Sequence, residues 1–164
     1  MIITDIENQT DVHAEISKAT KKDIKDITKA KTFVFDWKRY LDSEEHQIYK
    51  LYTEETKEIL GLMCLKNWPE PGFEYVEVVT LELRKDQIGK RKRYGRLAGC
   101  LFAFAASVSY ENGFQGWISL VAKTKTAPIF AEKYGFHHIG MINSLTPKMA
   151  SDHLNSSKLI QAYL

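Results

Sequence analysis

Hydrophobic and polar residues follow patterns along this chain that predict most of its secondary structure. Residues 46–53 alternate and residues 59–66 are almost entirely apolar, so together they predict a hairpin whose second strand is buried on both faces. Residues 73–83 alternate and are rich in β-branched and aromatic side chains, which predicts another strand. The aromatic segment 33–40 fits either a helix or a strand. Shorter apolar runs predict strands at 14–17, 117–121 and 136–142.

Helical spacing is clearest in the middle of the chain. Apolar residues recur there at helical intervals from 97 to 112, and Gly113 is placed to end the helix. Thr20 followed by Asp23 has the capping-box spacing, which predicts the start of a short helix. Further helices are expected from Thr124 or Thr126 to Gly135, around 148–154 and, unless that segment is a strand, at 159–164.

The order of these elements indicates the fold class. Strands and one helix come first, and strand–helix–strand–helix–strand follows, whereas residues 1–12 are polar and weakly patterned. This order predicts an α+β fold with a mixed, mostly antiparallel central sheet of about six or seven strands, flanked by helices. The length of 164 residues fits a single domain that spans residues 1–164.

Composition and charge exclude several classes of protein. The chain has 23 basic and 21 acidic residues, a net charge of +2, which is too balanced to predict nucleic-acid binding from bulk charge. Cys64 and Cys100 lack metal-ligand spacing and are read as buried reduced thiols, and the five histidines form no metal pattern, so no metal is expected. No secretion signal and no run of ~20 apolar residues is present, which predicts a cytoplasmic protein without membrane contact.

The most informative junction is a basic loop that enters the central helix. Five basic residues approach the helix start: Lys90, Arg91, Lys92, Arg93 and Arg96. Helix N-termini carry unpaired amides and partial positive charge, so this junction suits phosphate groups. From this segment alone, a solvated basic loop is an equally good interpretation.

Two motifs in this half of the chain resemble the GNAT superfamily of N-acetyltransferases. Arg93-Tyr-Gly-Arg-Leu-Ala98 is similar to the family loop [Q/R]-x-x-G-x-[G/A], although Arg96 stands where the first glycine is usual; Lys90–Gly95 is an alternative register. Ala127-Pro-Ile-Phe-Ala-Glu-Lys-Tyr-Gly-Phe136 resembles the end of the family's second helix, with Ala131 where a tyrosine is common. The likeness covers residues 14–142, and the long loop resembles a bacterial subgroup with an extended pyrophosphate loop.

The resemblance implies the GNAT fold and an enzyme that uses acetyl-CoA as co-substrate, without a metal. It implies direct transfer of the acetyl group to an amine acceptor, either a small molecule or a peptide. Because paired domains are common in this family, a homodimer is an alternative to a monomer. The cofactor-binding residues that it implies are Leu81, Leu83, Lys92, Arg93, Tyr94, Gly95, Arg96, Leu97, Ala98, Lys123 and Thr124.

The implied reaction needs a base, because a lysine-like amine is protonated near neutral pH and must be neutral to attack. Glu77 and Glu82 are the catalytic candidates, on opposite faces of the strand 73–83, and each could instead be an ion-paired or solvated strand residue. Tyr134 could replace the tyrosine missing at Ala131, although it is better explained as a core residue, and Tyr94 could line the phosphates or stack on the adenine. Aromatic candidates for the acceptor side are Trp37, Tyr40, Trp68 and Tyr75.

Two other functions compete with catalysis. The departures at Ala131 and Arg96 favour a catalytically silent GNAT-like module that binds CoA without turnover. The basic loop 90–93 raises a third hypothesis, nucleic-acid binding, which is the least favoured because Tyr94 is the one stacking aromatic within the loop.

Overall fold

The computed structural model describes residues 1–142 and 146–164. They form two compact units, Met1–Leu65 with Thr80–Leu101, and Lys66–Val79 with Phe102–Leu164. Hydrogen bonding joins nine strands in the order β6-β1-β2-β3-β4-β5-β7-β9-β8. The predicted α+β fold with a mixed, mostly antiparallel sheet is confirmed, but this sheet of nine strands is larger than expected.

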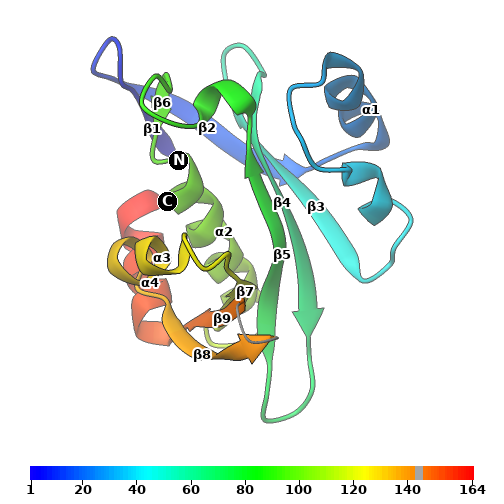
Figure 1. Cartoon of the computed structure of the whole chain (residues 1–164), viewed down its shortest axis with the longest axis vertical. Helices are drawn as coiled ribbons and strands as arrows, with labels where there is room; N and C mark the ends of the chain where they lie inside the picture. The colour runs from blue at the N-terminus through cyan, green and yellow to red at the C-terminus, as the bar shows by residue number, and fades with distance from the viewer. Residues whose placement is uncertain (143–145) are drawn as a thin grey trace. The chain divides into compact units, whose positions relative to one another are not determined.

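The first unit holds the strands of the N-terminal half, shown from blue to green in Figure 1. β1 pairs antiparallel with β2 and with β6, and β2 pairs antiparallel with β3. The short β6 therefore ties the segment just before the central helix to the N-terminal strand. The strands of this unit are β1 (Ile2–Asp5), β2 (Thr10–Lys18), β3 (His46–Thr53), most of β4 (Ile59–Trp68), the end of β5 (Tyr75–Leu83) and β6 (Tyr94–Gly95).

Helix α1 (Lys21–Ala30) begins where the capping box predicted. The Thr20 side chain accepts from the Asp23 amide, and the Asp23 side chain accepts from the Thr20 amide. Ile24 and Ile27 form its buried face. The ambiguous aromatic segment that follows contains a short 3-10 helix, η1 (Trp37–Tyr40), and a second one, η2 (Lys85–Gln87), follows β5.

The central helix α2 (Leu97–Glu111) agrees with the predicted range to within one residue. Its buried side chains include Leu97, Leu101 and Phe102. Beyond its end, Gly113 adopts the left-handed conformation with φ of 80°, as expected for a residue that follows a helix.

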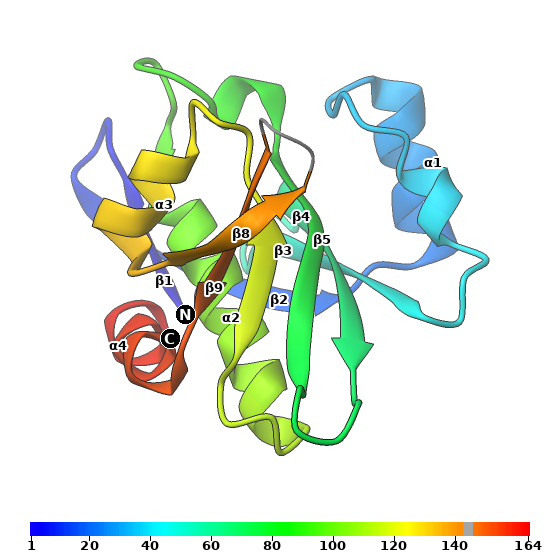
Figure 2. The same cartoon turned by 60° about the horizontal axis from the view of Figure 1, so that its bottom comes forward.

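The second unit combines the start of β5 with β7 (Ile118–Val121), β9 (Thr146–Ser151) and β8 (His137–Ile142). β7 pairs parallel with β5 and antiparallel with β9, and β9 pairs antiparallel with β8. Helices α3 (Ala127–Tyr134) and α4 (His153–Tyr163) lie near each other in both views (Figures 1 and 2). The rings of Phe130, Tyr134 and Phe136 all contact the ring of Phe102, so Tyr134 is a core residue.

Three strands were missed by sequence analysis, and one helix was misplaced. β1 and β6 are too short to show a pattern, since they contain four and two residues. Residues 146–151 form β9 where a helix around 148–154 was expected; α4 begins only at His153, after the capping residue Asp152. Proline is disfavoured within strands, yet the Pro147 carbonyl accepts from the Ala122 amide at 3.0 Å.

The predicted last segment at 159–164 falls within α4 apart from Leu164, so it is helical. No helix in the described part of the chain combines the length and apolar character needed to cross a membrane.

Candidate functional site

The first turn of α2 presents backbone amides that the protein does not use. None of the described residues accepts a hydrogen bond from the amides of Leu97, Ala98 or Gly99, and the helical bonds begin when Cys100 donates to Arg96 at 3.0 Å. Such first-turn amides, together with the helix dipole, form an anion-binding position. Arg96 precedes them in the left-handed conformation, with φ of 69°, where the family motif has glycine.

The loop before α2 is held by the first unit's own side chains. The Tyr94 ring is buried, and its amide donates to Gln87 Oε1 at 2.9 Å. Arg93 Nε donates to Asp5 Oδ2 at 3.1 Å, and the Arg93 carbonyl accepts from the Ile6 amide at 2.7 Å. The Tyr94 amide and the Arg93 side chain are thus used within the protein, unlike the first-turn amides of α2.

Hydrogen bonds at this junction also shift the pKa of Asp5. Hydrogen bonds from the Asn8 backbone and from Arg93 outweigh the effect of burial and hold the pKa of Asp5 below its usual range. Asp5 in turn raises the pKa of Arg93. Lys90, Arg91 and Arg96 are exposed at this junction.

The other predicted cofactor residues divide between the two units. Leu81 and Leu83 are half-buried near the end of β5, and Lys92, Gly95 and Ala98 are half-buried around the loop and helix start. Lys123 and Thr124 are exposed and follow β7 in the second unit. The structure thus groups nine of the eleven predicted cofactor residues in the first unit, from Leu81 to Ala98.

Glu82 is a buried anchor for the segment between α1 and η1. Its side chain is 7% exposed. Oε1 accepts from the Val34 amide at 2.5 Å, and Oε2 accepts from the Phe35 amide at 3.2 Å and from Trp37 Nε1 at 2.8 Å. A carboxylate has about four acceptor positions, so most of the capacity of Glu82 is used inside the protein.

Glu77 has a more open environment, in the second unit. It is half-buried, and its Oε2 accepts from Trp68 Nε1 at 2.8 Å. In the parallel pairing of β5 with β7, Glu77 lies opposite Ser119. One indole donor orients this carboxylate and leaves acceptor positions for another group.

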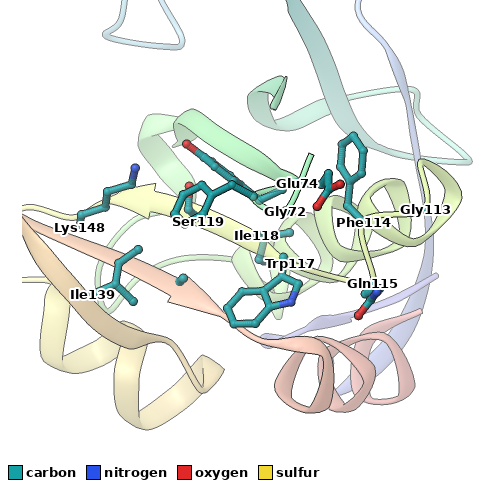
Figure 3. A pocket seen from close by; sticks show the side chains of 13 residues that line it. Gly72, Glu74, Gly113, Phe114, Gln115, Trp117, Ile118, Ser119, Ile139 and Lys148 are labelled. Carbon is teal, nitrogen blue, oxygen red and sulfur yellow. The ribbon is translucent and has the colours of Figure 1, made fainter. Parts of the chain in front are cut away.

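A pocket of about 510 Å³ opens in the same unit (Figure 3). Its walls are largely aromatic or apolar, and Ser119 and Lys148 are among its polar groups. Of the predicted acceptor-side aromatics, Tyr75 lines the pocket and Trp68 stacks on Tyr75, with ring centroids 5.9 Å apart. Trp37 is instead buried against Glu82, and Tyr40 packs against His46.

Sequence analysis missed Ser119 and Lys148. Ser119 is one residue of a short apolar strand, and Lys148 falls in a segment predicted as helix. Neither residue belongs to a sequence motif, because the pairing of β7 with β9 brings them close from distant parts of the chain. No group of three or more His, Cys, Asp or Glu side chains among residues 1–142 and 146–164 is arranged to hold a metal ion.

No protein-family model matches the chain, and no curated protein matches it in sequence. Solved structures do match. The GNAT domain of PAT from S. lividans aligns with a TM-score of 0.62 and 12% identity, over 92% of this chain and 95% of that one. The chain has the GNAT fold. FeeM, an N-acyl amino acid synthase from uncultured soil microbes, aligns with a TM-score of 0.60 and 13% identity, over 90% of this chain and 94% of that one.

A third similar structure was solved with AcCoA bound. AtaTR bound with AcCoA aligns with a TM-score of 0.57 and 14% identity, over 89% of this chain and 97% of that one. These likenesses span nearly the whole of each protein, so the fold matches as a complete unit.

Proposed function

We propose that this protein is an acyl-CoA-dependent N-acyltransferase, with acetyl-CoA as the donor. The observation that carries the proposal is the first turn of α2, whose amides at Leu97, Ala98 and Gly99 have no acceptor among the described residues. A diphosphate supplies acceptors for such amides, and the exposed Arg91 and Arg96 add positive charge nearby. The structure of AtaTR with AcCoA supports acetyl-CoA as the ligand of this fold.

In the proposed reaction a neutral amine attacks the carbonyl carbon of the thioester. The C–N bond forms, the C–S bond breaks, and CoA leaves as a thiolate that takes a proton from solvent. The proton lost from the amine nitrogen passes to a carboxylate. We assign this role to Glu77, because one indole N–H orients it while acceptor positions stay available. Glu82 is the weaker candidate, because three protein donors already occupy it.

The leaving group needs no tyrosine at position 131. Ala131 is exposed on α3, and Tyr134 is buried in the aromatic cluster around Phe102. A thiol has a pKa near ~8.5, so a thiolate is a tolerable leaving group near neutral pH. The absence of the tyrosine is therefore compatible with turnover at a moderate rate.

Release of CoA thiol from acetyl-CoA with a panel of amines tests the proposal. We expect amine-dependent thiol release in the wild type, a loss of about a hundredfold in Glu77→Gln, and activity close to wild type in the folded fraction of Glu82→Gln. If Glu82→Gln abolishes turnover in folded protein while Glu77→Gln does not, the assignment of the base is wrong.

A catalytically silent CoA-binding module is the second candidate, favoured by the alanine at position 131. It predicts saturable acetyl-CoA binding without thiol release above the rate of spontaneous hydrolysis for every amine in the panel. Amine-dependent turnover that Glu77→Gln removes excludes it.

A further inference from the structure

The pocket of the second unit lies on one face of its strands (Figure 3). Ser119 lies opposite Glu77 of β5 on one side and opposite Ala150 of β9 on the other. Side chains on paired positions project from the same face, so the lining residues Tyr75, Ser119, Lys148 and Ala150 share it. Glu77 lies on the same face beside Ser119, next to the lining residues and not among them. The rim comes from the loops at 72–74 and 113–117.

The pocket walls suit a flat apolar group. The Tyr75 ring is stacked on Trp68, at 5.9 Å and 12° between planes, and meets Phe73 edge-on at 5.9 Å. Trp117, Phe73 and Ile139 also line the pocket and are exposed. Rings held in this way favour an aromatic or large apolar ligand, because such a ligand is buried against the rings without any rearrangement of their side chains.

The Ser119 hydroxyl lacks a hydrogen-bond partner. The residue is 4% exposed, and its Oγ is the one buried side-chain N or O atom among the described residues that has no partner. Buried polar groups are nearly always paired, and one left unpaired in a pocket wall indicates that a ligand supplies the partner. The hydroxyl can donate to a carboxylate or accept from an amine.

Lys148 adds a positive charge to the pocket. It is half-buried, its Nζ lies 5.3 Å from the centroid of the Tyr75 ring, and no carboxylate of the described residues pairs with it. In the strand register Lys148 lies opposite Val121, two residues beyond Ser119, which itself lies opposite Glu77. The backbone of Lys148 is therefore at the same end of this face as Glu77. Figure 3 shows Glu74 on the other side of the pocket, beside Phe114. A ligand carboxylate is thus favoured near Lys148, and an acidic group is disfavoured near Glu74.

We propose that this pocket binds the acyl acceptor, and that the acceptor is a free α-amino acid with an aromatic or large apolar side chain. The inference rests on the proposed function, because that function requires an amine. The α-carboxylate pairs with Lys148 and Ser119, the α-amine faces Glu77, and the side chain lies along Tyr75 towards Trp117. Acyl transfer forms the amide C–N bond, breaks the C–S bond, passes the amine proton to Glu77 and yields an N-acyl amino acid and CoA.

Calorimetric titration without acyl-CoA tests the ligand class directly. L-phenylalanine is compared with phenethylamine, which lacks the carboxylate, with 3-phenylpropionate, which lacks the amine, and with alanine, which lacks the ring. We expect L-phenylalanine to bind about tenfold more tightly than each of the three. If 3-phenylpropionate or phenethylamine binds as tightly as L-phenylalanine, the proposal is overturned.

Variants separate the role of the pocket charge from a general loss of folding. Lys148→Met should weaken L-phenylalanine about tenfold and leave phenethylamine unchanged, and Lys148→Arg should restore part of the affinity. Ser119→Ala should weaken L-phenylalanine as well. Lys133→Met is the matched control, since Lys133 lies 5.4 Å from the Tyr134 ring on exposed α3, outside the pocket, and should change nothing.

The experiment distinguishes failure of this inference from failure of the proposed function. Acetyl-CoA binding and thiol release with other amines, but no binding or acylation of L-phenylalanine, would overturn the assignment of the acceptor and leave the acyltransferase proposal standing. Binding of L-phenylalanine that depends on Lys148, in a protein that binds no acyl-CoA, would overturn both the acceptor role and the proposed function. Acylation of L-phenylalanine that Lys148→Met reduces supports the inference.

Discussion

Replacing Glu82 by glutamine tests the anchor that holds the segment between α1 and η1. The carboxylate accepts three hydrogen bonds, from the amides of Val34 and Phe35 and from Trp37 Nε1. A glutamine side chain offers one carbonyl oxygen, so an NH2 group must face at least one N–H donor. With that oxygen at the Oε2 position, the donors of Phe35 and Trp37 keep their acceptor and the Val34 amide loses its own, which predicts a destabilisation of about 2 kcal/mol.

Glu77→Gln is the matched control. Its carboxylate accepts a single hydrogen bond, from Trp68 Nε1, and the carbonyl oxygen of glutamine can replace that acceptor. We expect a change below about 1 kcal/mol. Glu82→Ala should be at least as destabilising as Glu82→Gln, because it removes every acceptor for the same three donors.

Urea denaturation followed by circular dichroism measures the difference between the two variants. With a denaturant slope of about 2 kcal/mol/M, the midpoint of Glu82→Gln should fall by about 1 M, and that of Glu77→Gln by less than about 0.5 M. Hydrogen exchange should also show faster exchange of the Val34 and Phe35 amides in Glu82→Gln alone. Equal midpoints for the two variants, with both amides still protected, would refute the anchoring role.

Three further predictions follow from the described contacts. Partial burial raises the pKa of Asp23, but hydrogen bonds from Lys50 and Thr20 outweigh it and lower the pKa. The stabilisation that Asp23 gives the folded state should therefore be complete above the unfolded pKa of about 4, and lost as pH falls through the folded pKa. Urea midpoints of Asp23→Asn should vary less with pH in this range than those of the wild type. Burial raises the pKa of the Cys100 thiol to about 11; iodoacetamide at about pH 8 should therefore modify it in urea but not in native protein, and rapid native labelling would contradict its burial. The basic loop should give only weak DNA or RNA retention that added salt removes in a mobility-shift assay, and tight binding in high salt would contradict this.

The elements that sequence analysis predicted well are those with long and regular patterns. The alternation of β5 and the apolar repeat of α2 are local properties, and the Thr20–Asp23 cap is formed by side chains three residues apart. β1 and β6 are stabilised by pairing with partners far away in the sequence, as in the register of Asp5 with Tyr94. A reading of local patterns cannot detect such pairing. β9 was missed for the same reason, since its pairing with β7 and β8 outweighs the tendency of Pro147 to interrupt a strand.

The candidate site was likewise predicted only where its residues are neighbours in the sequence. The α2 junction could be predicted because its basic residues, helix start and motif are contiguous in the chain. The anchoring of Glu82 could not, because its donors at Val34, Phe35 and Trp37 belong to a segment whose pattern fits a helix and a strand equally well. The pocket could not be predicted either, since strand register brings Ser119 and Lys148 to one face from distant parts of the sequence.

Calorimetric titration of acetyl-CoA into Ala98→Pro and Ala98→Ser tests whether the first-turn amides of α2 bind the diphosphate. Proline is tolerated in the first helical turn and removes one amide N–H, whereas serine keeps it. We expect the wild type and Ala98→Ser to bind acetyl-CoA with similar affinity, and Ala98→Pro to bind about tenfold more weakly with unchanged helical content. Equal affinity for all three proteins, or no binding of acetyl-CoA or a longer acyl-CoA to the wild type, would contradict this expectation.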